Sequence, residues 1–341
     1  MIRRLVVHIF RGIRGGVLDD IGKINLLIGP NNSGKTIVLE ALYLVGVCGQ
    51  RGQVLILDME PGAETAQALN LYDFLGEEPL ARLRARHGLP REGVYRSQEE
   101  PADQFAVLEI EGEMPAPDRV LLFDFHAISE RFSKQFTHRI KDTVVDWHEK
   151  ISERMGRVFP EIKGAEVEID SMPGTAQEET GYIRLPGKAR LRIEQFGNGT
   201  RHAFKVLGSL IALTEMVTEE QPGLFLWEYP ELFMHPAALN RLLQEVLDLV
   251  LNKPVQVFMT TQSLDVLAFF AKLVEENDSL AKDIRVYALG LLNGKLQHQK
   301  FVGRGLASWF RSFGDPRLSA EEEMASPLYY FLSGDRERDD D

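Results

Sequence analysis

One octapeptide near the amino terminus constrains the fold of this chain more than any other feature. The run Gly29-Pro30-Asn31-Asn32-Ser33-Gly34-Lys35-Thr36 fits the P-loop pattern G-x-x-x-x-G-K-[ST]. The apolar run 24–28 before it predicts a buried strand, and the run 37–44 after it predicts a helix. A true P-loop lies between a strand and a helix, and the flanking runs predict both elements. We therefore set aside a chance match in a glycine-rich loop.

The residue types of this loop explain how it would hold a nucleotide. Gly29 and Gly34 permit a tight backbone turn, and N–H groups at a helix start carry partial positive charge. Lys35 can reach the β- and γ-phosphates, and the Thr36 hydroxyl can ligate Mg²⁺. The residues expected to contact ATP in this loop are Asn31, Asn32, Ser33, Gly34, Lys35 and Thr36.

Composition places the chain among globular proteins of a reducing compartment. It has 341 residues, of which 44% are hydrophobic and 26% charged. No apolar run approaches the ~20 residues of a membrane span, and the amino terminus lacks the pattern of a signal peptide. The single cysteine, Cys48, excludes an intrachain disulfide. We therefore expect a cytoplasmic protein without a membrane partner.

Charge leaves nucleic-acid binding open as a local property only. The formal net charge of −12 disfavours unspecific binding over the whole surface. Two basic clusters are present: Arg82, Arg84, Arg86, His87, Arg91 and Arg96, and separately Arg3, Arg4, Arg11 and Arg14. For each cluster, a solvated face paired with nearby acids is preferred slightly over a DNA site.

Strand and helix patterns alternate along the chain, which favours an α/β sheet built by crossovers. Expected strands are 2–10, 107–110, 120–125, 224–227, 255–260 and 284–289, with short strands within 164–195. Residues 65–88 are expected to be largely helical, split in two by Gly76 and Pro79, and residues 127–158 to form one or two helices. Further expected helices are 202–218, 236–251 and 264–276. We expect residues 1–50 and 190–300 to form two halves of one core. Residues 51–189 would be a variable helical and β insertion lobe, and residues 301–341 an extension with an acidic tail.

A P-loop needs a second element, an acid at the end of a neighbouring strand that helps to hold Mg²⁺. Glu228 ends the apolar strand 224–227 and is the candidate, together with Thr36. A carboxylate that merely faces water at the strand end is the less favoured interpretation.

Five motifs in order resemble one superfamily. They are Ile9-Phe10-Arg11-Gly12-Ile13, the P-loop, Phe196-Gly197-Asn198-Gly199-Thr200-Arg201, Pro230-Glu231-Leu232-Phe233-Met234-His235-Pro236 and Thr260-Thr261-Gln262-Ser263. The chain resembles the ABC-type heads of SMC and RecF-like ATPases, nearest to the AAA-domain proteins of the overcoming-lysogenization-defect (OLD) group. The resemblance covers about residues 1–50 and 190–290. It implies a P-loop NTPase fold with an ABC-type head, a mixed or parallel sheet and a helical insertion lobe.

The same resemblance implies a mechanism in which ATP joins two copies of the chain. Two heads would sandwich two ATP molecules with Mg²⁺, so that Gly197, Asn198 and Gly199 of one copy meet the nucleotide held by the other. His235 would lie at that interface, although a capping role before Pro236 is nearly as favoured. We expect a homodimer or higher homo-oligomer without a Toprim nuclease domain. A separate nuclease or toxin chain would be the effector, in phage defence or DNA maintenance.

Three departures from the family pattern predict slow hydrolysis. Tyr229 stands where a second acid usually acts as base, and a phenol with a pKa near ~10 is a poor base. Gln262 replaces the switch histidine and Gly197 the signature serine. Glu231 could serve as base or hold a turn, and the two roles are weighted equally. Glu228, Glu231 and Gln262 are thus the candidate catalytic residues.

Three alternatives follow from these motifs. One is an ATP-sensing scaffold with little hydrolysis, and another is a RecF-like repair ATPase that binds DNA. A metabolic P-loop kinase or GTPase is disfavoured, because it explains neither the signature-like run 196–201 nor the run 230–236, and no Asn-Lys-x-Asp motif occurs.

Overall fold

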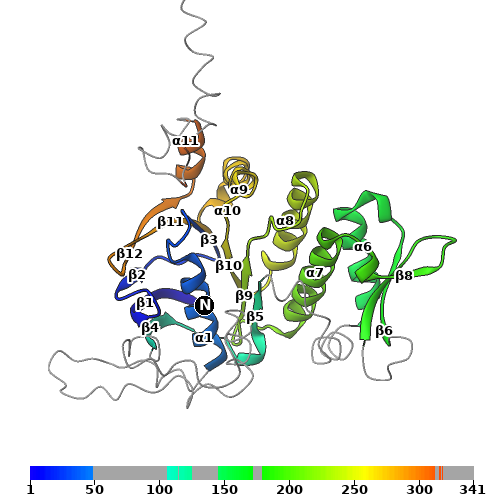
Figure 1. Ribbon diagram of the computed structural model, residues 1–341, viewed down its shortest axis with the longest axis horizontal. Coiled ribbons are helices and arrows are strands. Elements are labelled where there is room, and N and C mark those ends of the chain that lie inside the picture. Colours follow the sequence, from blue (N-terminus) through cyan, green and yellow to red (C-terminus); the bar gives the residue numbers. More distant parts are fainter. Residues whose placement is uncertain are drawn as a thin grey trace, which may run out of the picture.

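A six-stranded sheet forms the core of the computed structural model, which describes residues 1–48, 106–113, 115–124, 145–171, 179–311, 315 and 317. From one edge to the other its strands are β12 (Lys295–Val302), β11 (Ile284–Leu292), β3 (Ile24–Ile28), β10 (Val255–Thr260), β9 (Gly223–Glu228) and β5 (Val120–Phe123) (Figure 1). Neighbouring strands run parallel, except that β11 and β12 are antiparallel. The α/β fold with a mixed, mostly parallel sheet is as predicted.

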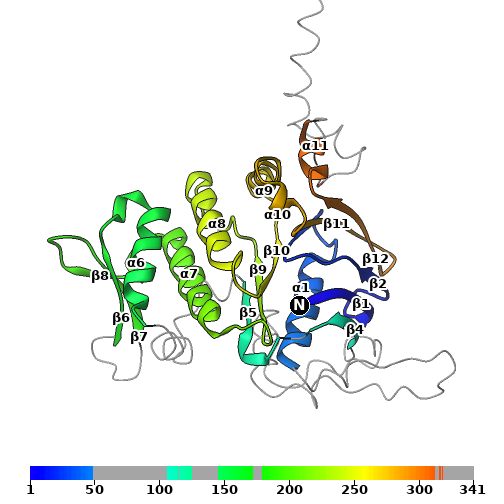
Figure 2. The same cartoon turned by 180° about the vertical axis from the view of Figure 1, so that it is seen from behind.

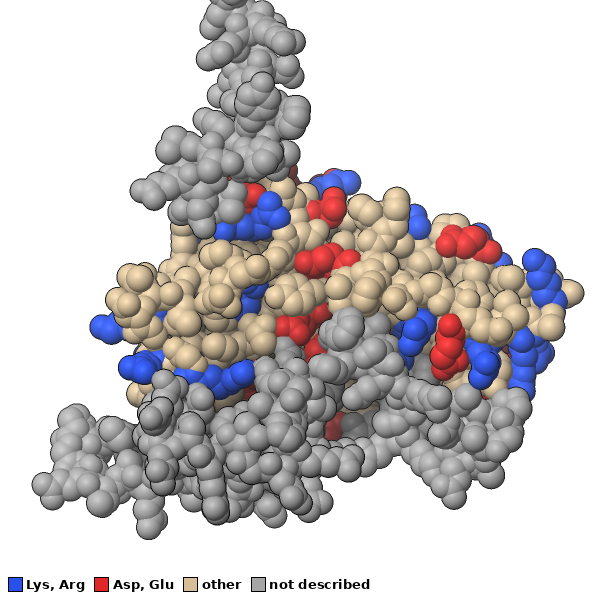
Figure 3. All heavy atoms as spheres, in the orientation of Figure 1, with Lys and Arg blue, Asp and Glu red and all other residues tan. Residues whose placement is uncertain are grey.

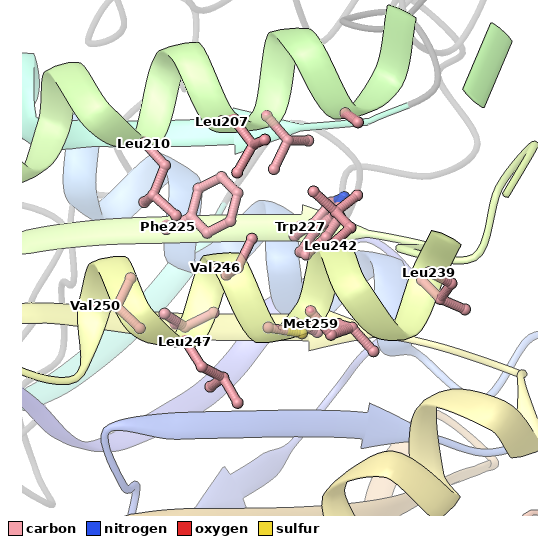
Figure 4. Packing of buried hydrophobic residues seen from close by; sticks show 14 of the residues in the cluster. Leu207, Leu210, Phe225, Trp227, Leu239, Leu242, Val246, Leu247, Val250 and Met259 are labelled. Carbon is pink, nitrogen blue, oxygen red and sulfur yellow. The ribbon is translucent and has the colours of Figure 1, made fainter. Parts of the chain in front are cut away.

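Helices cover both faces of this sheet, and for that reason its central strands are buried along their whole length and mostly apolar. Every residue of β3, β9 and β10 is buried. One face carries α1 (Lys35–Cys48), and the other carries α7 (Asn198–Met216), α8 (Pro236–Val250) and α9 (Leu264–Glu276), with the short α10 (Asp278–Ala281) after α9. Figure 4 shows Phe225 and Trp227 of β9 between α7 and α8.

A second, antiparallel sheet packs on the far side of α1. Its order is β2 (Gly16–Leu18), β1 (Ile2–Phe10) and β4 (Ala106–Gly112). The buried Gln256 of β10 fastens it to the core: its Nε2 donates to the Ile2 carbonyl (2.8 Å) and its Oε1 accepts from the Ile2 N–H (3.0 Å). These bonds satisfy backbone groups that would otherwise be buried unpaired.

The insertion lobe lies at the other end of the molecule (Figure 2). It contains α6 (Trp147–Val158) and a sheet of order β6 (Glu166–Ser171), β7 (Glu179–Arg184) and β8 (Arg190–Arg192). Short 3₁₀ turns lie at Pro117–Arg119, Pro160–Ile162 and Ile193–Gln195. The buried Glu245 of α8 accepts from Arg154 of α6 (2.6 Å), and Arg157 adds a second ion pair. These pairs tie the lobe to the core.

The carboxyl-terminal part extends the core beyond the expected border at residue 300. β12 pairs with β11 along its length, and the helix α11 (Gly305–Arg311) packs beside α9. Trp309 contacts the Phe301 ring edge-on, with centroids 5.1 Å apart.

Several predicted boundaries differ from the structure. The helix expected at 202–218 begins at Asn198, because the Gly197 carbonyl already accepts from Thr200 and Arg201. β2 and β12 were not predicted. β4 and β5 fall within the expected lobe 51–189, but they pair with β1 and β9 of the core. We therefore propose that the lobe proper excludes these two strands.

Other predictions fall wholly or partly outside the described residues. These are the helix at 65–88, most of the helical stretch 127–158, the basic cluster from Arg82 to Arg96 and the acidic tail.

Candidate nucleotide site

The candidate site residues gather at one edge of the sheet. Since β3, β10 and β9 are neighbours and parallel, their carboxyl ends lie at the same edge. The P-loop follows β3, Glu228 ends β9, and the segment 261–263 follows β10. Ligands of open α/β sheets bind at this edge.

The P-loop wraps around its own lysine. Lys35 Nζ donates to the carbonyls of Gly29 (2.8 Å) and Pro30 (2.7 Å) and lies 3.4 Å from Ser33 Oγ. Gly29 has φ +134°, and a Cβ there would lie 2.4 Å from the Leu289 carbonyl oxygen. No other residue type fits that position without displacing the backbone. The pattern glycine therefore has a steric basis in this chain.

Electrostatics keep a buried cation at the loop. Burial lowers the pKa of Lys35, while the carboxylates of Glu228 and Glu231 oppose that shift. Lys35 as a whole residue is only 4% exposed. A buried ammonium gains from an anionic partner, so the loop is suited to phosphate.

Thr36 and Glu228 meet, as the sequence predicts for a magnesium site. Thr36 Oγ1 donates to Glu228 Oε1 at 2.6 Å, across 192 positions of sequence. Hydroxyl and carboxylate oxygens are hard ligands that suit Mg²⁺, which commonly keeps waters and phosphate oxygens as its remaining ligands. Within the described part of the chain, no cluster of three or more acidic, histidine or cysteine residues offers a fuller metal site.

A further hydroxyl lies beside this pair and was missed by the sequence reasoning. Thr260 is fully buried, and its Oγ1 has no hydrogen-bond partner among the described residues. Thr260 pairs in register with Glu228, and strand alternation puts both on the face that α1 covers. A buried hydroxyl that neighbours Glu228 and has no partner in the described part of the chain fits a hydrated cation there. Only the position of Thr260 at a strand end could have signalled it.

The loop after Glu228 has an unusual backbone. Tyr229 adopts φ +51° and Phe233 φ +64°, a left-handed region that non-glycine residues rarely occupy. The Tyr229 N–H donates to the Thr260 carbonyl (2.9 Å), which keeps this residue at the sheet edge. Strain of this kind is concentrated at functional sites.

Glu231 binds the segment that follows β10. Its Oε2 accepts from Thr261 Oγ1 (2.9 Å) and its Oε1 from the Gln262 N–H (3.0 Å). Burial raises the pKa of Glu231, and hydrogen bonds from this segment counteract the rise. The carboxylate thus ties the turn in which Glu231 lies to the segment after β10, and a structural role of this kind is one of its two predicted roles. To act as a base it would have to release one of these donors.

Gln262 connects the two sides of the site. Its Nε2 donates to Asn31 Oδ1 (2.6 Å), so the switch position contacts the P-loop directly. The Gln262 carbonyl accepts from Arg317, whose guanidinium also pairs with Asp315. No sequence pattern indicates this contact from Arg317. Asn32 is exposed, with φ +64°.

The signature-like segment is presented to solvent at the start of α7. Gly197 and Asn198 are exposed, and among the described residues nothing lies within 4 Å of a Cβ built on Gly197. Gly199 differs, because a Cβ there would lie 2.8 Å from the Phe233 carbonyl oxygen. Gly199 is therefore required by packing within one chain, whereas Gly197 is free to face a partner.

His235 caps α8. Its Nδ1 accepts from the Ala237 N–H (3.2 Å), and Pro236 occupies the first helical position. The capping role that the sequence left open is present, and the exposed ring can still contact a second molecule.

His202 is a buried polar residue that the sequence analysis did not single out. Trp227 Nε1 donates to its Nε2 (3.0 Å), and its Nδ1 lies 3.0 Å from the Leu232 carbonyl oxygen. Burial, supported by the charge of Lys205 and opposed by the Leu232 bond, lowers the pKa of His202 from 6.5 to about 4. The imidazole is therefore neutral at pH 7.

This shift predicts a pH-dependent stability. The unfolded chain binds a proton at His202 below the usual pKa of 6.5, whereas the folded chain does so only near 4. The contribution of neutral His202 to the free energy of unfolding is therefore fully present above about pH 6.5. It falls as the pH decreases, by ~2 kcal/mol between about pH 7 and about pH 5. Urea unfolding of the wild type and of His202→Gln at both pH values measures it. The contribution of His202 is refuted if both proteins lose the same free energy.

Two of the amino-terminal arginines, Arg4 and Arg11, are engaged with acids. Arg4 pairs with Glu111 (2.6 Å), and Arg11 pairs with the buried Glu40 of α1. On the face seen in Figure 3, basic and acidic side chains are interleaved over the lobe, where Arg190 pairs with Asp170 (2.7 Å). The pairings of Arg4 and Arg11 agree with the solvated-face interpretation of the amino-terminal cluster.

The fold and these contacts define an α/β P-loop NTPase with an ABC-type head. Residues 24–268 match the family described as "AAA domain, putative AbiEii toxin, Type IV TA system". Because this match spans more than half of the chain, the chain belongs to that family.

The individual relatives either match a shorter segment than the family does or have a low sequence identity. A segment of 46 residues is 50% identical to the DNA replication and repair protein RecF of Psychromonas ingrahamii, covering 14% of this chain and 13% of that protein. The chain thus matches about an eighth of the length of this curated relative.

Similar solved structures are SMC heads. One is the SMC head bound to the C-winged helix domain of ScpA, with 14% identity, TM-score 0.49 and coverage of 88% of this chain and 97% of that one. Another, derived from Pyrococcus furiosus, has 12% identity, TM-score 0.49 and coverage of 92% and 99%. Within the described residues, no helix is both long and apolar enough to span a membrane.

Proposed function

We propose that this chain is an ATP-binding head that associates with a second copy through Mg–ATP held between them. The observation that carries the proposal is the contact of Thr36 with Glu228 at an edge where the start of α7 is also exposed. Each copy would then supply a P-loop to one nucleotide and Gly197, Asn198 and Gly199 to the other. Exposed N–H groups at a helix start suit a γ-phosphate.

Hydrolysis in this proposal is slow and serves to open the pair. Glu228 and Thr36 hold Mg²⁺, Gln262 orients the attacking water or senses the γ-phosphate, and Glu231 holds the sensing segment or acts as base. Tyr229 in the usual base position supports weak turnover, since a phenol does not take up a proton readily at neutral pH. If the chain did not hydrolyse ATP at all, it would act as an ATP sensor, the first of the alternatives given above.

We further propose that the head controls a separate effector, a nuclease or toxin, in phage defence. Membership of a family described with a type IV toxin–antitoxin system supports this setting. Kinship with the OLD group remains a prediction. The RecF similarity favours DNA maintenance as the second candidate, and a salt-dependent complex with DNA would favour it over the first.

Substitutions at Gly197 test the sandwich without disturbing the fold. No described residue lies within 4 Å of a Cβ at this position, and φ is −61°, so a side chain fits among the residues that the structure describes. Gly197→Asp and Gly197→Ser both supply a favoured N-cap, but only Asp sets a negative charge against the partner's γ-phosphate. We expect Asp to abolish ATP-dependent dimers in sedimentation and Ser to retain them. Equal dimerisation of the two variants would refute the proposed role of this segment.

A further inference from the structure

One buried side chain joins the signature helix to the loop beyond Glu228. His202 lies three residues after Gly199, in the first turns of α7, and has no exposed surface. It binds Trp227, which directly precedes Glu228 in β9, and Leu232, which directly follows Glu231. Figure 4 shows Trp227 at the end of β9, beside α7.

The direction of these bonds is fixed by chemistry. An indole N–H can only donate, so His202 Nε2 must accept from Trp227. The proton of the neutral ring therefore lies on Nδ1 and is donated to the Leu232 carbonyl. An apolar residue at this position would leave a buried donor and a buried acceptor unpaired. A residue that served packing alone would not need both bonds.

The loop that His202 reaches is the one that holds the nucleotide-sensing segment. Within it the Leu232 N–H donates to the Tyr229 carbonyl and the Met234 N–H to the Glu231 carbonyl, both at 3.0 Å. Glu231 in turn holds Thr261 and Gln262. A shift of this loop would thus reach Leu232 and, through it, His202.

A second contact joins the same loop to the start of α7. The Phe233 carbonyl lies against Gly199, so closely that a Cβ would be 2.8 Å from its oxygen. The loop and the first turn of α7 therefore touch at two places, Phe233 with Gly199 and Leu232 with His202. Movement of one requires movement of the other, because packed contacts transmit displacement.

We propose that His202 is a positioning residue that couples each head's own nucleotide site to the start of its α7, the surface offered to the partner. The inference deepens the proposed function, which supplies the partner's nucleotide as the ligand of that surface. Occupation of one site would then favour engagement of the other, and this coupling is reciprocal by thermodynamic necessity.

Hydrogen exchange on dilute, monomeric protein tests the bridge separately from dimer formation. Exchange of segments 198–204 and 229–235 is measured with and without a non-hydrolysable ATP analogue and Mg²⁺, and sedimentation reports the mass of the same samples. In the wild type we expect the nucleotide to slow exchange in both segments. In His202→Phe only segment 229–235 should respond.

Three further variants sharpen this test. His202→Gln can accept from Trp227 and donate to Leu232, so it should restore the response of 198–204. Trp227→Phe removes the hydrogen bond to His202 Nε2 and leaves His202 itself unchanged. It therefore keeps the test decisive if the His202→Phe protein fails to fold. Ser209→Ala is the matched control, since Ser209 is buried in the same helix and its Oγ has no hydrogen-bond partner in the described part of the chain. It should behave as the wild type.

Dimer formation at high concentration supplies the second readout. We expect the ATP-dependent dimer of His202→Phe to be weakened about tenfold, within the range usual for coupling between sites. An unchanged response of 198–204 in His202→Phe, or no response in the wild type, overturns the inference. A coupled response in a protein that stays monomeric at saturating nucleotide supports the bridge and refutes the sandwich instead.

Discussion

Lys35→Met is expected to lower ATP hydrolysis by about 10²–10³-fold, the loss seen when one preorganised donor to a developing charge is removed. Lys35 Nζ already lies within hydrogen-bonding distance of three oxygens of the P-loop, so the loop positions it where phosphate oxygens would bind. Nucleotide affinity should fall by at least about tenfold, since a hydrogen bond to a charged group contributes about 1.5–3 kcal/mol.

Stability provides the control for this substitution. Burial already lowers the pKa of Lys35, which means that the ammonium group is held at a cost in free energy. Methionine has a similar length without the charge, so thermal unfolding should occur at the same or a slightly higher temperature. Titration with a fluorescent ATP analogue and a steady-state phosphate assay measure the two effects. A folded Lys35→Met protein that hydrolyses ATP within tenfold of the wild type would contradict the assigned role.

Tyr229→Glu is expected to raise hydrolysis by about 10²-fold or more, because a positioned general base contributes typically about 10²–10⁴-fold. Position 229 directly follows Glu228, and its N–H is fixed to the Thr260 carbonyl. A carboxylate there would lie at the site edge with a backbone that is already held. The left-handed φ of +51° is strained for tyrosine as for glutamate, so the exchange adds no new backbone cost.

An amide at the same position separates base catalysis from other effects. Tyr229→Gln removes the phenol but cannot accept a proton from water, and we expect it to leave the rate near that of the wild type. Equal acceleration by Gln and Glu would show that loss of the tyrosine, and not gain of a base, causes the change. Glu231→Gln adds a third comparison: if Glu231 only holds Thr261 and Gln262, the Tyr229→Glu rate should survive it in part.

The local elements of this fold could be predicted because their signals are contiguous in sequence. The buried strand at 24–28 and the following glycines fix the P-loop. The apolar run before Glu228 identifies its strand end. The pairing of Thr36 with Glu228 then follows from the geometry of a parallel sheet, in which strand ends converge.

The rest depends on contacts between distant segments. β2 has three residues, and its pairing with β1 is not encoded in a long alternating pattern. The predicted start of α7, residue 202, is four residues later than the observed one, Asn198, because glycine and asparagine are weak helix formers. Capping by Gly197 overrode that preference. The contact of Gly199 with Phe233 could not be foreseen, since it needs the tertiary approach of two loops.

Buried polar residues were the least predictable part of the site. His202 lies in a helix whose buried residues are mostly apolar, and no local sequence pattern distinguishes it from a core position. Its bonds to Trp227 and Leu232 arise only when α7 packs on β9. Thr260 shows the same limitation, because the lack of a hydrogen-bond partner for its Oγ1 among the described residues depends on how the sheet packs.

Sedimentation of the full chain with Mg²⁺ and a non-hydrolysable ATP analogue tests the central claim most directly. The account predicts a doubling of mass, or a higher closed multiple, that ADP does not support and that Lys35→Met and Gly197→Asp abolish. A protein that binds the analogue to saturation and still sediments as a single copy would contradict it.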